Sequence, residues 1–275
     1  MAKLKPLLLA ALLCGCSTTG EPPARPGKLT IVGGGLSADN AEVWSAFIDS
    51  AQGNGPIVII PAASGYPTES ADGAAAAMTR HGVKPSRIST ARLAVMDDPT
   101  TDDVDESDWS TNATDADTVA LLRSASAVWF TGGDQRRITE LLLDTPALAA
   151  IRDAHARGAG IGGTSAGAAM MSDPMITGGF RDESDSEPLT MDQGLGFLSD
   201  VIVDQHFSER GRLWRLTEAV ERYPTRLGLG VDEDTALVGS APDFVVLGRG
   251  TLTVVRDGKV ERIPPGHAIS LPESP

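Results

Sequence analysis

Short apolar runs alternate with segments of helical periodicity through most of this chain. Apolar runs of strand length lie at 29–32, 56–60, 89–95, 127–131 and 160–163. Between them, apolar residues recur at the spacing of one helix face. The pattern predicts helices at 40–51, 69–81, 115–124, 137–143 and 146–157, and a further helix from Ala166. This alternation favours a three-layer α/β fold, in which a mainly parallel sheet carries helices on both faces.

The last third of the chain has a different pattern. Two strands, at 201–203 and 227–231, flank a predicted helix at 209–223. Short turns then join strands at 235–239, 244–247 and 251–255, with no helical segment between them. Strands joined in this way pair antiparallel, so we expect a C-terminal antiparallel extension of the sheet.

The first residues are typical of an export signal. Lys3 and Lys5 precede an apolar run at 7–13, which is too short to span a bilayer and fits the core of a signal peptide. The sequence that follows, Leu-Cys-Gly-Cys, resembles a bacterial lipobox, whose last cysteine is lipidated and becomes the first residue of the mature protein. The alternative is a plain signal peptide that is cut at small residues.

The expected organisation follows from this reading of the N-terminus. We expect a signal peptide at 1–15, a linker at 16–28 that starts with lipidated Cys16, and a single folded domain at 29–275. The protein would then be exported and anchored to the bacterial cell envelope by lipid, which would be its only contact with the membrane. The sequence leaves the oligomeric state open, and a homodimer is one of the options.

Composition narrows the partners and the chemistry. The formal net charge is −14, and phosphate binding needs clustered Lys and Arg, so nucleic acid is not an expected partner. The chain has two cysteines. Cys14 would leave with the signal and Cys16 would carry lipid, so no thiol remains for a disulfide, a metal site or a nucleophile. We expect neither a metal nor a cofactor.

An acidic segment at 97–117 contains almost no apolar residues. We interpret it as a solvated loop that leads into the next helix. The alternative, a calcium loop, lacks the EF-hand spacing and its central glycine.

A G-x-S-x-G motif is the strongest chemical signal in the chain. It spans 163–167 and stands after a predicted strand and before a predicted helix, which is the context that this motif needs. The glycines allow a sharp turn that exposes the hydroxyl of Ser165. The helix N-terminus beneath it favours developing negative charge. The sequence therefore predicts Ser165 as a nucleophile, against the alternative of an ordinary Gly-rich turn.

A serine nucleophile needs a base, and His206 is the candidate. It follows an apolar strand, and ligand sites of open parallel sheets lie at the carboxyl ends of their strands. The other histidines, His81, His155 and His267, are expected to be surface residues. A carboxylate should orient the imidazole. Three consecutive acids, at 232–234, follow the next strand, and the residues alone do not choose between them.

Two glycine-rich turns are further candidates. The turn at 131–135 could supply the N–H of Gly133 to an oxyanion hole, with the N–H of Ala166 as the other donor; the alternative is a plain turn. The segment 33–38 matches the dinucleotide fingerprint. No acid follows the second strand as that fingerprint requires, so a nucleotide cofactor is not expected.

Arginines cluster after His206. Arg210 lies at the start of the predicted helix, and Arg212 and Arg215 are three residues apart on one helix face. They favour a cationic pocket rim for a substrate carboxylate, against the alternative of surface salt bridges with nearby Glu residues.

Taken together, these motifs resemble one family. The segments 130–135, 163–168, 204–213 and 230–233 look like those of cyanophycinase, the S51 group of serine peptidases, which is related in fold to aspartyl dipeptidase and to class I amidotransferase domains. The likeness spans roughly 29–248. It implies a class I amidotransferase-like, flavodoxin-like fold, with Ser165 as nucleophile, His206 as base and Glu233 as the third member of the triad. It further implies a pocket lined by these residues: Gln135, Asp204, Gln205, Arg210, Arg212 and Arg215.

The implied substrate is cyanophycin, a polymer with an aspartate backbone and arginine side chains. The implied reaction is acyl-enzyme hydrolysis that releases β-Asp-Arg dipeptides. An exported form would scavenge external polymer. Trp214 departs from the family, which usually carries a small residue there, and this bears on the width of the pocket. Two alternatives stay open: a peptidase for other β-aspartyl or Asp-containing peptides, and a non-catalytic envelope binding protein on the same scaffold.

Overall fold

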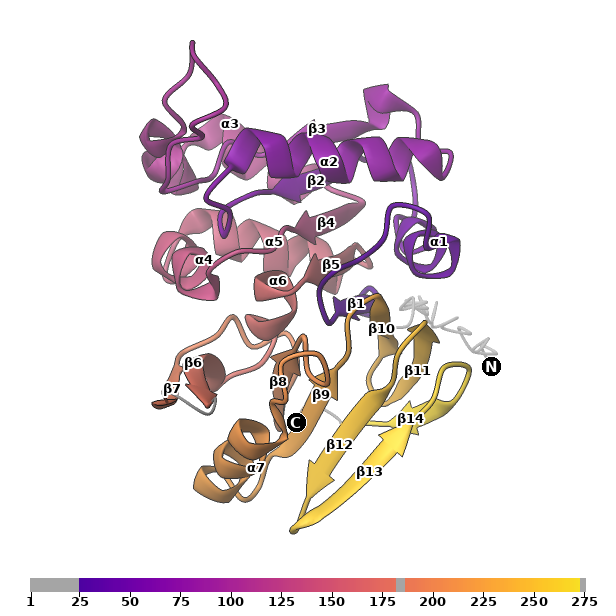
Figure 1. Cartoon of the computed structure of the whole chain (residues 1–275). Coiled ribbons are helices and arrows are strands. Elements are labelled where there is room, and N and C mark those ends of the chain that lie inside the picture. Colours follow the sequence, from indigo (N-terminus) through magenta and orange to yellow (C-terminus); the bar gives the residue numbers. More distant parts are fainter. Residues whose placement is uncertain (1–24, 182–185, 273–275) are drawn as a thin grey trace, which may run out of the picture.

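A computed structural model of the chain describes residues 25–181 and 186–272. Its largest sheet has eight strands within these residues, and Figure 1 shows the parallel strands of that sheet with their helices above a smaller second sheet. In spatial order the strands are β14 (Ala268–Ser270), β11 (Asp243–Gly248), β10 (Thr235–Ser240), β1 (Leu29–Val32), β5 (Gly160–Thr164), β4 (Ala127–Phe130), β2 (Ile57–Ile60) and β3 (Ile88–Thr90). Strands β1 to β5 are parallel to one another, whereas β10, β11 and β14 extend the sheet in antiparallel pairs.

Helices cover both faces of this sheet. They are α1 (Ala41–Asp49), α2 (Pro67–Arg80), α3 (Ala116–Ser124), α4 (Gln135–Leu142), α5 (Pro146–Ala156) and α6 (Ala166–Ala169), with 3₁₀ turns at Pro85–Arg87 and Glu106–Thr114. Side chains alternate between the faces along each strand. In β2, Ile57 and Ile59 pack with α1 and α2, whereas Val58 and Ile60 pack with helices α3 to α6. Because both faces are buried, the strand is continuously apolar, as the sequence pattern indicated.

The second sheet lies beside the carboxyl ends of β1 and β5. It has the order β13 (Lys259–Ile263), β12 (Leu252–Arg256), β9 (Leu227–Val231) and β8 (Val201–Gln205), with β8 and β9 parallel. Helix α7 (Leu213–Arg222) packs on it, and Gly228 of β9 leaves room for Leu216 and Val220. A hairpin of β6 (Met175–Arg181) and β7 (Ser186–Asp192) completes this lower part of the molecule (Figure 1).

The predicted fold class and the antiparallel C-terminal strands are confirmed. Several details differ. Strands β8 and β9 belong to the second sheet and not to the main parallel sheet. The strand predicted at 89–95 ends at Thr90, the helix predicted at 209–223 begins at Leu213, and the helix after Ser165 ends at Ala169. The β6–β7 hairpin was not predicted.

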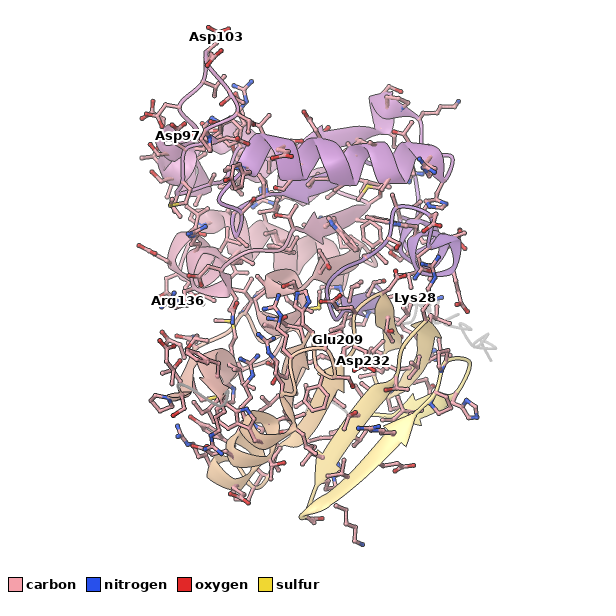
Figure 2. The ribbon with its side chains drawn as sticks, viewed as in Figure 1. Lys28, Asp97, Asp103, Arg136, Glu209 and Asp232 are labelled. Atoms are coloured by element: carbon pink, nitrogen blue, oxygen red, sulfur yellow. The ribbon has the colours of Figure 1, made fainter. Side chains whose placement is uncertain are left out.

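The acidic segment is not simply solvated. The side chains of Asp98 and Glu106 are buried, and both bind neighbouring polar groups. Glu106 accepts hydrogen bonds from Thr68 at 2.6 Å and from Thr101 at 3.1 Å, and Asp98 accepts one from the N–H of Glu69 at 2.9 Å. Asp103, by contrast, lies at the tip of a loop that stands away from the body (Figure 2). The interpretation as a solvated loop is therefore wrong for two of its carboxylates, which hold the segment to α2.

The predicted signal peptide, Cys16 and most of the linker lie outside the described residues. Near the first described residues, the N–H of Gly27 donates to the carbonyl of His155 at 2.9 Å. This hydrogen bond ties the chain to the end of α5 just before β1. Among the helices of the described part, none is both long enough and apolar enough to cross a membrane.

Candidate active site

Ser165 stands on a sharp turn between β5 and α6. Its backbone angles are φ 55° and ψ −109°, a left-handed conformation that is costly for a non-glycine residue. The two flanking glycines allow it. A Cβ on Gly163 would lie 2.4 Å from the carbonyl oxygen of Gly167, and one on Gly167 would lie 2.6 Å from that of Phe130. This is the geometry expected of a nucleophile elbow, because it places the hydroxyl above the strand end.

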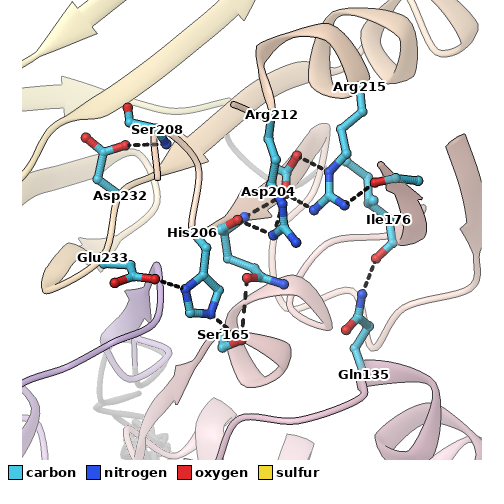
Figure 3. A network of polar contacts seen from close by, with 12 residues as sticks. Gln135, Ser165, Ile176, Asp204, His206, Ser208, Arg212, Arg215, Asp232 and Glu233 are labelled. Carbon is cyan, nitrogen blue, oxygen red and sulfur yellow. Dashed lines mark hydrogen bonds and ion pairs between the residues drawn. The ribbon is translucent and has the colours of Figure 1, made fainter. Parts of the chain in front are cut away.

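The imidazole of His206 lies between a hydroxyl and a carboxylate. Its Nε2 is 2.9 Å from Ser165 Oγ, and its Nδ1 is 2.5 Å from Glu233 Oε1 (Figure 3). The three residues follow β5, β8 and β9, so the main sheet and the second sheet meet at this point. Proton transfer from the hydroxyl to the imidazole, with the carboxylate orienting the ring, is chemically feasible in this arrangement.

The three consecutive acids have different positions. The carboxylate of Asp232 accepts hydrogen bonds from the N–H of Ser208 at 3.0 Å and from the hydroxyl of Thr251 at 2.7 Å. Asp234 turns the other way and accepts from Asn40 Nδ2 at 2.8 Å. Glu233 is the acid of this group that binds His206, in agreement with the choice that the family resemblance implied.

The glycine run after β1 shapes the site, a role that the sequence analysis missed. The carbonyl of Gly33 accepts a hydrogen bond from the N–H of His206 at 2.5 Å. A Cβ on Gly34 would lie 2.3 Å from the imidazole, and one on Gly35 would lie 2.8 Å from Glu233 Oε2. Three glycines directly after the first strand were the available signal for such a close backbone approach.

The environment of His206 favours its neutral form. Burial is the largest cause, and it lowers the pKa of His206 below the usual 6.5. The hydrogen bond to Glu233 acts in the opposite direction, and the charges of Arg210 and Arg212 add to the lowering. At neutral pH the ring is therefore unprotonated, which is the state that a base requires.

The predicted oxyanion-hole residues lie next to Ser165. Ala166 is the first residue of α6, so the helix itself offers no acceptor for its N–H. The turn of Gly132 and Gly133 passes the other side of Ser165: a Cβ on Gly132 would lie 3.3 Å from that of Ser165. Gly133 has φ +139°, and a Cβ there would lie 2.0 Å from the carbonyl oxygen of Ala63, so only glycine fits. The assignment of the N–H groups of Gly133 and Ala166 to an oxyanion hole stays a prediction.

A polar cavity of about 450 Å³ opens beside Ser165, towards β6 and α7. Of the predicted pocket residues, these line it: Gln135, Gln205, Arg210, Arg212 and Arg215. Arg210 is exposed and has no carboxylate partner among the described residues. Burial, with the charge of Arg215 next, lowers the pKa of Arg212 to about 10, so its guanidinium is still charged at neutral pH.

Asp204 differs from its predicted position. Its side chain is fully buried beneath the cavity and does not line it. It accepts hydrogen bonds from Nε of Arg215 at 2.7 Å and from Nη2 of the same guanidinium (Figure 3). Nη1 of Arg215 donates to the carbonyl of Gly179 at 3.0 Å. The prediction of Asp204 as a pocket-lining residue does not match this geometry, because its carboxylate is used to hold Arg215.

Glutamine and tryptophan side chains near the polar cavity have specific partners. Gln135 Nε2 donates to the carbonyl of Ile176 at 2.7 Å, which joins α4 to β6. Gln205 Oε1 is 3.4 Å from Ser165 Oγ. The ring of Trp214 lies 4.0 Å from the guanidinium of Arg181 and is not part of the cavity lining. The bulk of Trp214 therefore does not narrow the cavity directly.

A second cavity, of about 310 Å³, lies on the other side of Ser165 against α1 and α2. Nothing in the sequence analysis indicated it, because its walls come from segments far apart in the chain. In the described part of the chain, no group of three or more His, Cys, Asp or Glu side chains is arranged to hold a metal ion.

Comparisons with known proteins show the family of the chain. A model of the family described as Peptidase family S51 matches residues 29–245. A protein named Cyanophycinase from Geminocystis herdmanii is 38% identical over 239 residues, which cover 86% of this chain and 82% of that protein. Another of that name, from Trichormus variabilis, is 46% identical over 140 residues, which cover 50% of this chain and 47% of that protein.

Solved structures show the same fold. The crystal structure of a peptidase from an acI-B1 actinobacterium superposes with a TM-score of 0.66 at 22% sequence identity. The match covers 90% of this chain and 98% of that one.

Proposed function

The chain belongs to the S51 family of serine peptidases, and we propose that it hydrolyses cyanophycin to β-Asp-Arg dipeptides through an acyl-enzyme. The observation that carries this proposal is the contact of His206 with both Ser165 and Glu233, beside a cavity lined by arginines. The relatives named Cyanophycinase support the choice of substrate.

In the proposed first step, Ser165 Oγ attacks the scissile carbonyl while His206 Nε2 takes the hydroxyl proton. The developing oxyanion is stabilised by the N–H groups of Gly133 and Ala166. Collapse of this intermediate breaks the C–N bond, and His206 returns the proton to the leaving amine. The acyl group remains on Ser165 as an ester.

In the second step, His206 removes a proton from a water molecule that attacks the ester. The C–O bond to Ser165 breaks, and the serine hydroxyl is restored by the proton from His206. Glu233 orients the imidazole and stabilises its cation in both steps and transfers no proton itself.

Arginines of the polar cavity suit the free carboxylates that cyanophycin carries on its arginine units. Arg210 is exposed with no carboxylate partner in the described part, so its guanidinium is available to a substrate. Guanidinium groups bind carboxylates through two parallel hydrogen bonds, which fixes orientation as well as charge.

The test is to incubate the detergent-solubilised full chain with purified cyanophycin and to identify products by mass spectrometry. We expect β-Asp-Arg dipeptides, and none from a Ser165→Ala protein prepared in parallel. If other β-aspartyl peptides are hydrolysed and no dipeptide is released from the polymer, the proposed substrate changes from cyanophycin to this broader class of peptides. Labelling of wild type, and not of Ser165→Ala, by a serine-directed covalent inhibitor would separate an enzyme from a binding protein.

We also propose that the protein is exported and held to the cell envelope by lipid on Cys16. The short apolar run and the Leu-Cys-Gly-Cys sequence that follows it support this proposal.

A further inference from the structure

The second cavity beside Ser165 contrasts chemically with the arginine-lined one. Its lining comes from the Gly35–Ala38 segment, from α1 and α2, and from the ends of β4 and β5. Every side chain along it is uncharged, and the large ones are Leu36, Trp44 and Trp129. The ring centroids of the two tryptophans lie 4.9 Å apart, so they form a packed aromatic wall.

Ser165 lines both cavities, and the turn at Gly132 and Gly133 separates them. Gly132 lines the uncharged cavity and Gly133 the arginine-lined one. A peptide whose scissile carbonyl sits at Ser165 Oγ therefore has a cavity within reach in each of two directions. The uncharged cavity is thus placed to receive a residue of the substrate.

Two threonines with shielded hydroxyls belong to this uncharged lining. Thr131 and Thr164 belong to the lining, and each has a buried hydroxyl with no hydrogen-bond partner among the described residues. Thr131 is only 4% exposed. Both hydroxyl oxygens are shielded from solvent, so these residues present uncharged surface to the cavity and no hydrogen-bonding group.

We propose that this cavity is a substrate subsite for an uncharged aliphatic or aromatic side chain, on the residue across the scissile bond from the carboxylate-bearing unit. The inference rests on the proposed peptidase function and extends its substrates beyond cyanophycin, whose arginines flank every scissile bond. A charged side chain would lose water there without gaining an ionic partner, since the nearby carboxylate of Glu233 is bound to His206.

The test uses two series of peptides on the detergent-solubilised full chain. In one series a residue X is joined to the amino group of the Asp in a β-Asp-Arg unit. In the other series X is joined to the α-carboxyl group of that Asp. X is Leu, Gly, Lys or Glu. We expect Leu to exceed Lys and Glu by about tenfold or more in kcat/KM in one series, which is the discrimination that an apolar pocket provides.

A filling variant tests the location. Gly73 of α2 lines the cavity, and a Cβ there would meet nothing within 4 Å, so a side chain can begin at this position and Gly73→Leu adds bulk to the cavity. We expect it to lose the preference for Leu over Gly at X. Ala76→Leu is the matched control, because Ala76 is exposed on the same helix and does not line the cavity. Its Leu to Gly ratio should stay that of wild type.

Failure of the inference is distinguishable from failure of the proposed function. Equal rates for all X, or faster cleavage with Lys through stacking on the tryptophans, would overturn the subsite while the peptidase stands. If no peptide and no polymer is cleaved, the proposed function fails. Calorimetry with Ser165→Ala then decides the subsite alone: tighter binding of Leu than of Lys peptides supports it, and equal binding overturns it.

Discussion

At the scale of single residues, the site depends on two side chains held in unusual backbone conformations. Ser165 has φ 55° and His206 has φ 46°. Such conformations cost about 1–3 kcal/mol each and persist only where the surrounding structure holds them. Here the N–H of Ser165 donates to the carbonyl of Val32 at 3.0 Å and that of His206 to Gly33, so β1 and the loop after it fix both.

Removal of Ser165 or His206 tests whether the two act as one unit. The hydroxyl is weakly nucleophilic unless the imidazole takes its proton, so each alanine variant should lose about 10⁴-fold or more in kcat. The double variant should lose little more than either single one. Glu233→Gln should lose less, because it orients without transferring a proton. Kinetics on a β-Asp-Arg substrate measure this, and losses that multiply would remove the triad assignment.

The charge of Arg210 should contribute to the lower pH limit of activity, together with the burial of His206. Arg210 helps to hold the pKa of His206 below 6.5, so Arg210→Gln should raise that pKa. His206 must be neutral to act, and the acid limb of kcat/KM should therefore move to higher pH in the variant. The measurement is the pH profile of kcat/KM at low salt. Arg256→Gln, exposed on β12, is the control, and an unmoved limb in Arg210→Gln would contradict the electrostatic argument.

At the scale of elements, one buried ion pair joins three pieces of the lower half. Asp204 lies in β8, Arg215 lies in α7, and the carbonyl of Gly179 belongs to β6. Arg212, ahead of α7, lies 3.6 Å from the same carboxylate. This pair sets where α7 and the hairpin stand relative to Ser165, so it fixes one wall of the polar cavity. Arg215 is thus a positioning residue in addition to its predicted role as a substrate contact.

Breaking this pair on one side should destabilise the fold. Asp204→Ala leaves Arg215 buried without its carboxylate, and such a loss costs about 3–5 kcal/mol. Adding Arg215→Met to Asp204→Ala should recover part of it, because the uncompensated charge is removed. Glu218→Gln, in an exposed pair with Arg222, should change the unfolding free energy by under about 1 kcal/mol. Urea denaturation measures the unfolding free energy of each variant. A loss for Asp204→Ala as small as that for Glu218→Gln would contradict the prediction.

At the scale of the whole molecule, the first described residues and the active site lie at opposite ends of the parallel strands β1 and β5. The described chain enters at Gly27 and Lys28, ahead of β1, whereas Ser165 follows β5, which is parallel to β1.

The lipid anchor is tested by Cys16→Ser. Without the thiol the lipid cannot be attached, so the protein should leave the membrane fraction or remain unprocessed. Fractionation with immunoblotting for size checks this, with a Cys14→Ser protein as control, since Cys14 would be removed with the signal. A processed, mature-length Cys16→Ser protein that still fractionates with membranes would contradict the proposal.

What the sequence by itself determined is local. The strand–helix alternation gave the α/β class, because apolar periodicity records which faces are buried. The G-x-S-x-G context pointed to Ser165, because the elbow is built by neighbouring glycines. His206 was found from its place at a strand end. Glu233 was selected only through the family resemblance, since the three adjacent acids all carry a carboxylate and differ in where that carboxylate points.

Only the tertiary structure decided how distant segments meet. It places Gly34 over the imidazole of His206, buries Glu106 in an acidic segment that looked solvated, and puts Asp204 under the cavity instead of in it. It also assembles the uncharged cavity from α1, α2 and the loop after β1. No periodic pattern in the sequence indicates these contacts, because each depends on the packing of segments that are far apart in the chain.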